Sequence, residues 1–539
     1  MAFTSLAFAC FATILTIVYF AFKDKEYQWV ILLIGSYVFY FFTGVRIALF
    51  MVFTTVTTYA AGRLIGNNTR RTKAVIKEHK EEWDKKTKKA YRAERDKVSR
   101  RIMALTLLAN FGILFMLKYY KFLAVNINDL MGGSLPVFKF ILPLGISFYT
   151  FQSMGYLIDV YRGDTEDESN LFRFALFVSF FPQIIQGPIS AYDQLAHQLY
   201  EPHKPEYERF KFGLELILWG LFKKLVIADR ASTLIAVIKG TLDDGQPNGT
   251  MVTFLILVYA LQLYADFSAG IDISRGVAQI LGIDMIQNFR QPYFSISLTD
   301  YWNRWHISLG AWMRNYIFYP LALSDTAGKI TESIGNSSFG KTKAGAHIAN
   351  VLPGALASLV VFLVVGIWHG AEWKYIWFGI WNGLVIMIAI LIAPLMDSAN
   401  KALHIDPASF RHRVFRIIRT FILVCIGYYF DVAENATQAF LFLRQTVVGQ
   451  SMSGAVEAVS ANFDKYTLLD CGLLMMMTVL LYIVGILREK CPDVPLRVRI
   501  AQRSTLVQWL ILFVAIMTLL VLGVYGPGYD PQDFVYMQF

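Results

Sequence analysis

The chain has 539 residues, a formal net charge of +10 at pH 7 and 55% hydrophobic residues. Only 17% of its residues are charged, against about 25% in an average soluble domain. This composition excludes an ordinary soluble protein and predicts an all-α polytopic membrane protein. The four cysteines, Cys10, Cys425, Cys471 and Cys491, have no CxxC spacing, so they predict neither a metal site nor a disulfide framework.

A helix that crosses a bilayer needs about 20 apolar residues, and runs of that kind recur along the chain. The first run, 3–22, lacks a basic n-region and a cleavage site, so it is predicted to be a span and not a signal peptide. About 11–12 spans are predicted, from the runs 3–22, 28–44, 46–65, 102–121, 139–160, 212–238, 250–266, 350–369, 375–396, 416–432, 467–487 and 506–525.

The run at 171–189 is apolar but contains Pro182, Gly187 and Pro188. Proline breaks a spanning helix, so this run is predicted to be re-entrant and buried by protein.

The positive charge of the chain is concentrated in segment 67–101, which has fourteen Lys or Arg and six Asp or Glu. Between two apolar runs, such a segment indicates a basic cytoplasmic loop that follows the positive-inside rule, and not a nucleic-acid site. The basic segments 399–416 and 488–503 fall on the same side. This topology predicts that the N- and C-termini are extracytoplasmic.

The polar, aromatic segment 288–321 follows the span that ends near Asp266. Ser297 or Thr299 can cap a helix there, and Arg304, Trp305 and His306 stand together in "YWNRWHISL". An amphipathic interfacial helix is the simpler interpretation. It does not explain His306, because a polar ring between Trp305 and an isoleucine needs a partner.

A second histidine, His369, ends a long apolar run and stands between Trp368 and Gly370 in "VVGIWHGAEW". An ionisable residue within a membrane span indicates function, although a histidine at the headgroup level is an alternative. The flanking Gly366 and Gly370 allow another chain or a ligand to approach closely. The sequence has no P-loop and no GxSxG, which argues against an ATP-driven pump or a serine hydrolase. Two such histidines suit proton transfer near neutral pH.

The order of these motifs resembles the bacterial branch of the membrane-bound O-acyltransferase family. The resemblance covers residues 100–390 and is carried by "PLGISFYTFQSMGYLIDVYRG", "SFFPQIIQGPI", "YADFSAGIDISRGVAQILGI", "YWNRWHISL" and "IWHG". It implies one membrane-embedded acyltransferase domain over 1–539, a helical disc with funnels from both faces. Segment 67–101 departs from the family pattern and has no implied catalytic role.

By position, the resemblance makes His369 the family's near-invariant histidine and general base. His306 becomes a second active-site residue that positions the donor or stabilises developing charge. It implies substrate binding by Trp305, Arg304, Trp368 and Asp266.

The implied reaction moves an acyl group, acetyl first, from a cytoplasmic thioester to an envelope or exported polysaccharide. The donor would be acetyl-CoA or an acyl carrier protein, with no bound cofactor or metal. The implied partner is an extracytoplasmic SGNH-type acyltransferase, and the implied location is the bacterial cytoplasmic membrane, among its lipids. D-alanyl transfer to teichoic acid stays open, and so does a transporter of an envelope precursor. A transporter would tolerate His369→Ala better than an acyltransferase would.

The predicted extracytoplasmic segment 527–539 ends in "FVYMQF". We expect Tyr536 to act as an acyl carrier, since a phenol has a pKa near 10 and is easier to deprotonate than an alkyl alcohol. Phe534 and Phe539 would anchor the segment in an apolar funnel. The alternative is an apolar segment that packs against the last span or binds the partner.

Overall fold

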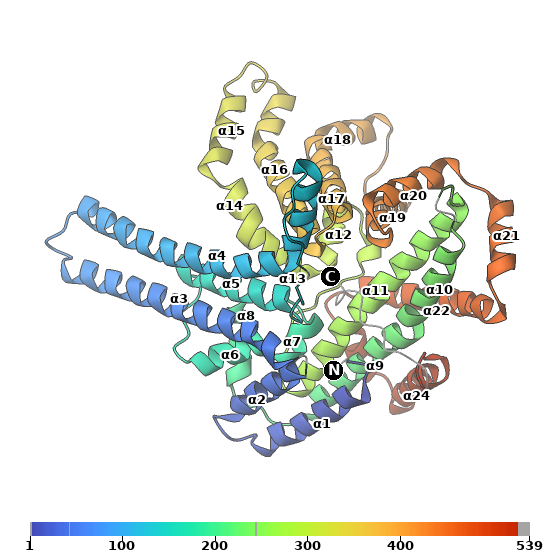
Figure 1. The fold of residues 1–539 in the computed structure, drawn as a ribbon, viewed down its shortest axis with the longest axis horizontal. Coiled ribbons are helices and arrows are strands. Elements are labelled where there is room, and N and C mark those ends of the chain that lie inside the picture. The colour runs from blue at the N-terminus through green and yellow to red at the C-terminus, as the bar shows by residue number, and fades with distance from the viewer. Residues whose placement is uncertain (1–2, 43, 139, 243–244, 527–539) are drawn as a thin grey trace. The chain divides into compact units, whose positions relative to one another are not determined.

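The computed structural model describes residues 3–42, 44–138, 140–242 and 245–526. Over these ranges the fold is helical, with no strand and one isolated bridge between Phe289 and Trp305. The chain divides into two compact units, unit 1 (Met1–Ile217 and Ile273–Ile286) and unit 2 (Leu218–Asp272 and Gln287–Phe539). The expected all-α class is confirmed (Figure 1).

Unit 1 contains the helices of the first two fifths of the chain. They are α1 (Leu6–Ala21), α2 (Gln28–Phe41), α3 (Val45–Glu78), α4 (Lys85–Met131), α5 (Ile146–Arg162), α6 (Leu171–Ser179), α7 (Phe181–Gln186), α8 (Tyr192–Tyr200) and most of α9 (Tyr207–Leu221).

Unit 2 begins where the π-helical η1 (Phe222–Ala228) continues α9, and it holds most of α11 (Gly249–Ile280). Its other helices are α10 (Asp229–Gly240), η2 (Pro292–Phe294), α12 (Leu298–Arg304), α13 (Ile307–Met313), η3 (Arg314–Phe318), α14 (Tyr319–Ala322), α15 (Asp325–Gly335), α16 (Lys343–His369), α17 (Trp373–Leu391), α18 (Ala393–Ala402), α19 (Phe410–Val432), α20 (Ala436–Val448), α21 (Met452–Asn462), α22 (Lys465–Lys490), α23 (Leu496–Ala501) and α24 (Thr505–Leu522).

Seven helices among the described residues are long and apolar enough to cross a membrane: α3, α4, α11, α16, α17, α22 and α24. The helices α1 and α2 are apolar but shorter. The other runs predicted as spans fall on α5, on α9 to α10 and on α19. The run 139–160 becomes helical only at Ile146, and these helices are shorter or include charged side chains such as Lys223, Lys224 and Arg419.

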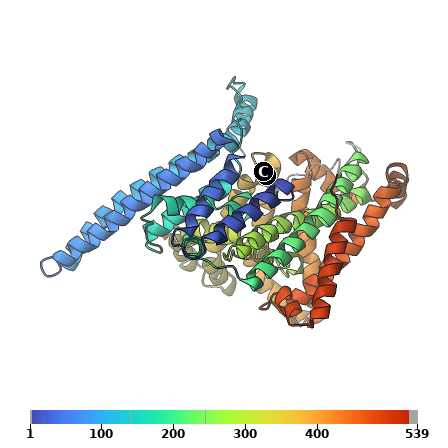
Figure 2. The same cartoon turned by 90° about the horizontal axis from the view of Figure 1, so that it is seen from below.

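The basic segment 67–101, expected as a loop between spans, is a helical hairpin. It joins the end of α3 to the start of α4, and Figures 1 and 2 both show the two helices side by side. Asp84 caps α4 by accepting from the Thr87 N–H at 2.7 Å. The Asn68 amide ties the helices together by donating to Ser99 Oγ at 2.8 Å. Lys, Arg, Glu and Ala are strong helix formers, which accounts for the helical conformation of this polar segment.

The apolar run at 171–189 is interrupted where its prolines predicted a break. The helix α6 ends at Ser179, and α7 starts with Pro182 in its first turn and ends before Gly187. Such a break frees backbone groups that need partners in an apolar environment. The amide of Gln152 supplies one by donating to the Phe177 carbonyl oxygen at 3.0 Å.

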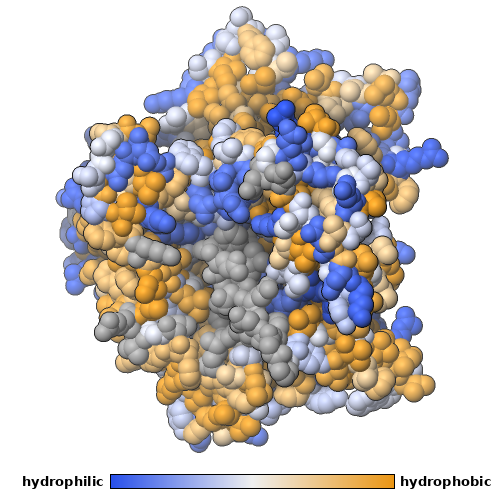
Figure 3. Space-filling model, turned by 45° about the vertical axis from the view of Figure 1, so that its right-hand side comes forward, coloured by the Kyte–Doolittle hydropathy of each residue, from blue (hydrophilic) through white to orange (hydrophobic). Residues whose placement is uncertain are grey.

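Apolar side chains cover much of the face drawn in Figure 3, which brings forward the side of Figure 1 where α22 and α24 lie. None of the apolar window of α24 is buried within the protein. Leu506 and Phe513 have exposed fractions of 80% and 61%. Surfaces of this kind fit contact with lipid, as expected for an integral membrane protein.

Glycines let α16 and α17 pack at close range, and this packing sets the position of His369 at the end of α16. A Cβ atom added at Gly366 would lie 2.3 Å from the Tyr375 carbonyl oxygen. A Cβ atom added at Gly379 would lie 2.4 Å from the Phe362 carbonyl oxygen. The close approach that the sequence predicted at Gly366 is therefore made by α17.

Gly366→Ala is predicted to destabilise unit 2, because the new methyl group meets backbone that cannot move aside. Overpacking of this kind costs about 1–3 kcal/mol. Gly472→Ala in α22 is the matched control, since a Cβ atom there meets nothing within 4 Å. The measurement is thermal unfolding of the purified variants in detergent. Equal unfolding temperatures for both variants would contradict the packing argument.

Candidate active site

The segment between α12 and α13 places His306 inside unit 2. Of the two predicted caps, Ser297 is the one that caps α12, by accepting from the Asp300 N–H at 3.0 Å. After α12 the chain pairs with residues 288–290, and the Ile307 N–H donates to the Asn288 carbonyl oxygen at 3.0 Å. His306 takes a left-handed conformation with φ of 47° and is 1% exposed. A bulky residue at positive φ is unusual and is held here by the pairing on both sides.

The hydrogen bonds of Asn288 fix the tautomer of His306. The Oδ1 atom of Asn288 accepts from the Ser308 N–H at 2.9 Å, so its Nδ2 is the atom 3.3 Å from His306 Nδ1. The amide donates, and Nδ1 therefore accepts. Burial, and secondly the charge of His369, lower the pKa of His306 well below its ordinary value. The ring is neutral at physiological pH and carries its proton on Nε2.

His369 is the last residue of α16 and is 5% exposed. Aromatic rings surround it. Its ring centroid lies 5.2 Å from that of Phe378 and 6.1 Å from that of Tyr375. Trp368 contacts both histidines, with centroid distances of 5.2 Å to His369 and 5.9 Å to His306. The structure thus brings together two histidines that are 63 positions apart in the sequence.

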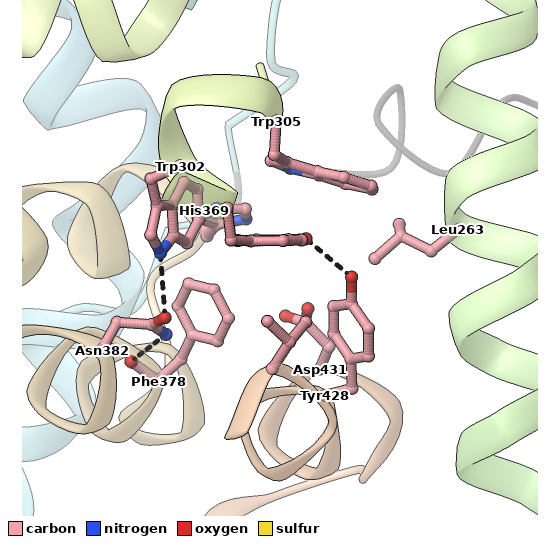
Figure 4. A pocket seen from close by; sticks show the side chains of 10 residues that line it. Leu263, Trp302, Trp305, His369, Phe378, Asn382, Tyr428 and Asp431 are labelled. Atoms are coloured by element: carbon pink, nitrogen blue, oxygen red, sulfur yellow. Dashed lines mark hydrogen bonds between the residues drawn. The ribbon is translucent and has the colours of Figure 1, made fainter. Parts of the chain in front are cut away.

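A pocket opens beside His369 within unit 2 (Figure 4). Its cavity volume is about 20 Å³, which is room for about one water-sized group. It is lined by Leu263, Tyr301, Trp302, Trp305, His369, Phe378, Asn382, Val424, Tyr428 and Asp431.

Two polar side chains of the pocket are already paired with each other. The indole N–H of Trp302 donates to Asn382 Oδ1 at 3.1 Å. The Nδ2 atom of Asn382 donates to the Phe378 carbonyl oxygen at 2.9 Å. These bonds hold the indole of Trp302 against the wall formed by α17.

Three tyrosines form a hydrogen-bonded chain with a fixed direction. The Tyr293 hydroxyl donates to the Ala260 carbonyl oxygen at 2.6 Å, since a carbonyl can only accept. Tyr293 must then accept from Tyr428, at 3.0 Å, and Tyr428 must accept from Tyr301, at 2.8 Å. Each phenol has one proton, so the proton of Tyr301 is directed toward Tyr428.

The residues predicted to bind substrate fall into two groups. Trp305 lines the pocket, and Trp368 contacts both histidine rings. Arg304 and Asp266 lie outside the pocket lining, in ion pairs. Arg304 contacts Asp300 and Glu489 at 2.8 and 2.6 Å, and Asp266 contacts Lys224 at 2.7 Å. Their contact with substrate rests on the resemblance alone.

The structure also adds pocket residues that the sequence analysis did not single out: Asn382, Tyr301, Tyr428 and Asp431. Asp431 had a detectable signal, because a carboxylate at the end of an apolar run indicates function in a membrane protein. The phenol chain had none, since its members are far apart in the sequence. Tyr536, Phe534 and Phe539 lie outside the described residues. Among the described residues, no three His, Cys, Asp or Glu side chains converge as ligands of a metal would.

Comparison with known proteins shows the family of the chain. The model of the membrane-bound O-acyltransferase family matches residues 164–332, a range that includes His306. The chain is 32% identical to the probable alginate O-acetylase AlgI of Pseudomonas syringae pv. tomato, over 77% of this chain and 68% of that protein. It is 27% identical to the peptidoglycan O-acetyltransferase of Helicobacter pylori, over 71% of this chain and 73% of that protein.

A third relative is named for the transfer of a different acyl group, D-alanyl. The chain is 26% identical to the teichoic acid D-alanyltransferase of Bacillus subtilis, over 53% of this chain and 67% of that protein. The similarity to these relatives extends well beyond the range of the family model. The chain therefore belongs to the membrane-bound O-acyltransferase family and is a multi-pass membrane O-acyltransferase.

Proposed function

We propose that the chain transfers an acyl group from a cytoplasmic thioester, across the bacterial cytoplasmic membrane, to a hydroxyl that leads to envelope polysaccharide. The observation that carries this proposal is the placement of His369, a buried histidine at the end of an apolar helix that lines a pocket. Such a group suits proton transfer and has no evident structural purpose in an apolar environment.

The proposed step has a simple proton balance. The acceptor hydroxyl gives its proton to His369, and its oxygen attacks the carbonyl carbon of the thioester. The new C–O bond forms, the C–S bond breaks, and the leaving thiolate takes the proton from His369. A positioned base contributes about 10²–10⁴ in rate.

His306 has a different role in this step. It is neutral, and its protonated Nε2 makes it a hydrogen-bond donor and not a base. A neutral imidazole donor can stabilise the negative charge that develops on the carbonyl oxygen, and a buried donor is effective because water is excluded. We therefore propose that His369 is the base and that His306 is a hydrogen-bond donor.

The acyl group has two candidates. Sequence identity favours acetyl, because the relatives at 32% and 27% identity are named for O-acetylation. The carboxylate of Asp431, which lines the pocket, favours an acyl group with an amine, such as D-alanyl. For the donor thiol we propose CoA, with an acyl carrier protein as the alternative.

The first acceptor in this proposal is the phenol of Tyr536, with Phe534 and Phe539 as anchors. The ester formed on a phenol is a better donor than an alkyl ester, which suits onward transfer to a partner. We propose an extracytoplasmic SGNH-type acyltransferase as that partner. This route requires both termini to be extracytoplasmic, as the basic segments predict.

His369→Gln is predicted to abolish acylation of envelope polysaccharide in cells, with a loss of at least about 10²-fold. His347→Gln is the matched control, because His347 belongs to the same helix, does not line the pocket, and places its Nε2 3.2 Å from the Ile390 carbonyl oxygen. The measurement is ester content of the polysaccharide at equal protein level. Normal acylation in the His369 variant would refute the assignment.

Tyr536→Phe is predicted to be inactive, because it removes one oxygen and keeps the aromatic ring. Tyr525→Phe is the control, since the Tyr525 hydroxyl donates to the Leu520 carbonyl oxygen near the end of α24. Intact-protein mass spectrometry of the wild type with a disabled partner should show one acyl group on the C-terminal peptide. Normal polysaccharide acylation by Tyr536→Phe would exclude the carrier.

His306→Ala is predicted to lower acyl transfer by about 10²–10³, the effect of losing one oxyanion donor. His306→Asn should retain part of the rate, because asparagine tolerates positive φ and its amide can donate. Since His306 stays neutral, the loss should be uniform between pH 5 and 8. The measurement is the pH–rate profile of the purified variants, and a loss confined to one end of that range would contradict this role.

A further inference from the structure

Asp431 brings an acceptor group into the pocket beside His369. The residue lies near the end of α19, and its side chain lines the pocket together with Tyr428 and Phe378 (Figure 4). Its Oδ1 atom is buried and has no hydrogen-bond partner among the described residues. A buried carboxylate oxygen without a hydrogen bond is costly in a folded protein, so this position calls for a ligand.

The lysine that interacts electrostatically with Asp431 is Lys374 at the start of α17. Its Nζ atom donates to the Ala433 carbonyl oxygen at 2.9 Å and lies 3.7 Å from Glu372. Lys374 therefore acts on Asp431 through its charge, while its Nζ atom donates to Ala433. Asp431 keeps an oxygen without a hydrogen bond, and its side chain lines the pocket.

Two other polar groups of the pocket have their donors bound within the protein. The indole N–H of Trp302 and the Nδ2 of Asn382 are bound to other protein atoms. The proton of Tyr301 points to Tyr428, so any further hydrogen bond made by the Tyr301 oxygen is one that it accepts. The polar lining thus includes two acceptors that recognise a donor, Asp431 and Tyr301, beside His369 and the indole N–H of Trp305.

The apolar lining of the pocket points to the same kind of ligand. Trp302, Trp305 and Phe378 present aromatic rings to a cavity of about 20 Å³. Aromatic faces attract cations, and an ammonium group has about the size of a water molecule. A methyl group of the same size would leave the carboxylate without a partner.

We infer that this pocket selects an acyl group that carries a protonated amine, and that Asp431 is its specificity-determining residue. The inference rests on the proposed acyl transfer at His369 and names its acyl class. In an α-aminoacyl thioester the amine is two bonds from the reacting carbonyl carbon. An ammonium group bound by Asp431 therefore holds that carbonyl at the pocket, beside His369.

The test gives the purified protein in lipid vesicles an equal mixture of S-acetyl-pantetheine and S-(D-alanyl)-pantetheine. The two donors share one thiol, so only the acyl group differs, and mass spectrometry measures the ratio of the two esters formed. The wild type should favour D-alanyl by at least about 100-fold, since sites built to bind a polar group reject analogues that lack it. Asp431→Asn should lower that ratio at least about tenfold.

Glu372→Gln is the matched control, because it removes another carboxylate that contacts Lys374 but does not line the pocket. It should leave the ratio unchanged. A wild type that favours acetyl would overturn the inference, and so would an Asp431→Asn ratio equal to that of the wild type. In both results the chain still transfers an acyl group, so the proposed function stands.

A second measurement uses only the wild type, in case Asp431→Asn does not fold. S-(D-lactyl)-pantetheine replaces the amine by a hydroxyl of similar size without charge. The wild type should favour D-alanyl over D-lactyl by at least about tenfold, and equal use of the two would overturn the inference. A wild type that turns over none of the three thioesters would contradict the proposed function itself.

Discussion

A polar group buried among apolar helices must find its partner inside the protein, and the site around His369 depends on this constraint. The clearest case is η1, where two adjacent lysines are buried. Lys224 contacts Asp266 at 2.7 Å and Asp229 at 2.9 Å, and Lys223 contacts Asp272 at 2.9 Å. Removing one partner of a buried pair typically costs about 3–5 kcal/mol. These pairs therefore fix α11 against η1 within unit 2.

Residues of α11 also form part of the site, so fixing this helix fixes their positions. Leu263, one turn before Asp266, lines the pocket. Ala260, a further turn before, accepts the hydrogen bond of Tyr293 at the end of the chain of tyrosines. One residue after Asp266, the Phe267 ring packs against His306 with a centroid distance of 4.9 Å. The buried phenols and the amide of Asn288 also need partners within the protein. Their hydrogen bonds determine which groups of the site donate and which accept. The proposed division of roles between His306 and His369 rests on these bonds.

Local signals in the sequence predicted much of this fold and part of the site. The apolar runs located the helices, the prolines located the break after α6, and the two histidines were singled out by their positions among tryptophans. The partners of buried groups could not be predicted. Asp266 pairs with a lysine 42 positions away, and the phenol chain joins Tyr293 to Tyr428. Such pairs are formed by helix packing, which leaves no local pattern. Asp431 was predictable from the sequence, because it is a carboxylate at the end of an apolar run.

The central claim is that His369 accepts the proton of the attacking hydroxyl. The most direct measurement is thiol release from an acyl-pantetheine thioester by purified protein in vesicles, with wild type and His369→Gln compared at equal folded amounts. We predict that the wild type releases one thiol per acyl group transferred, and that the variant is slower by at least about 10²-fold. Release at the wild-type rate by His369→Gln, with the ester still formed, would contradict it.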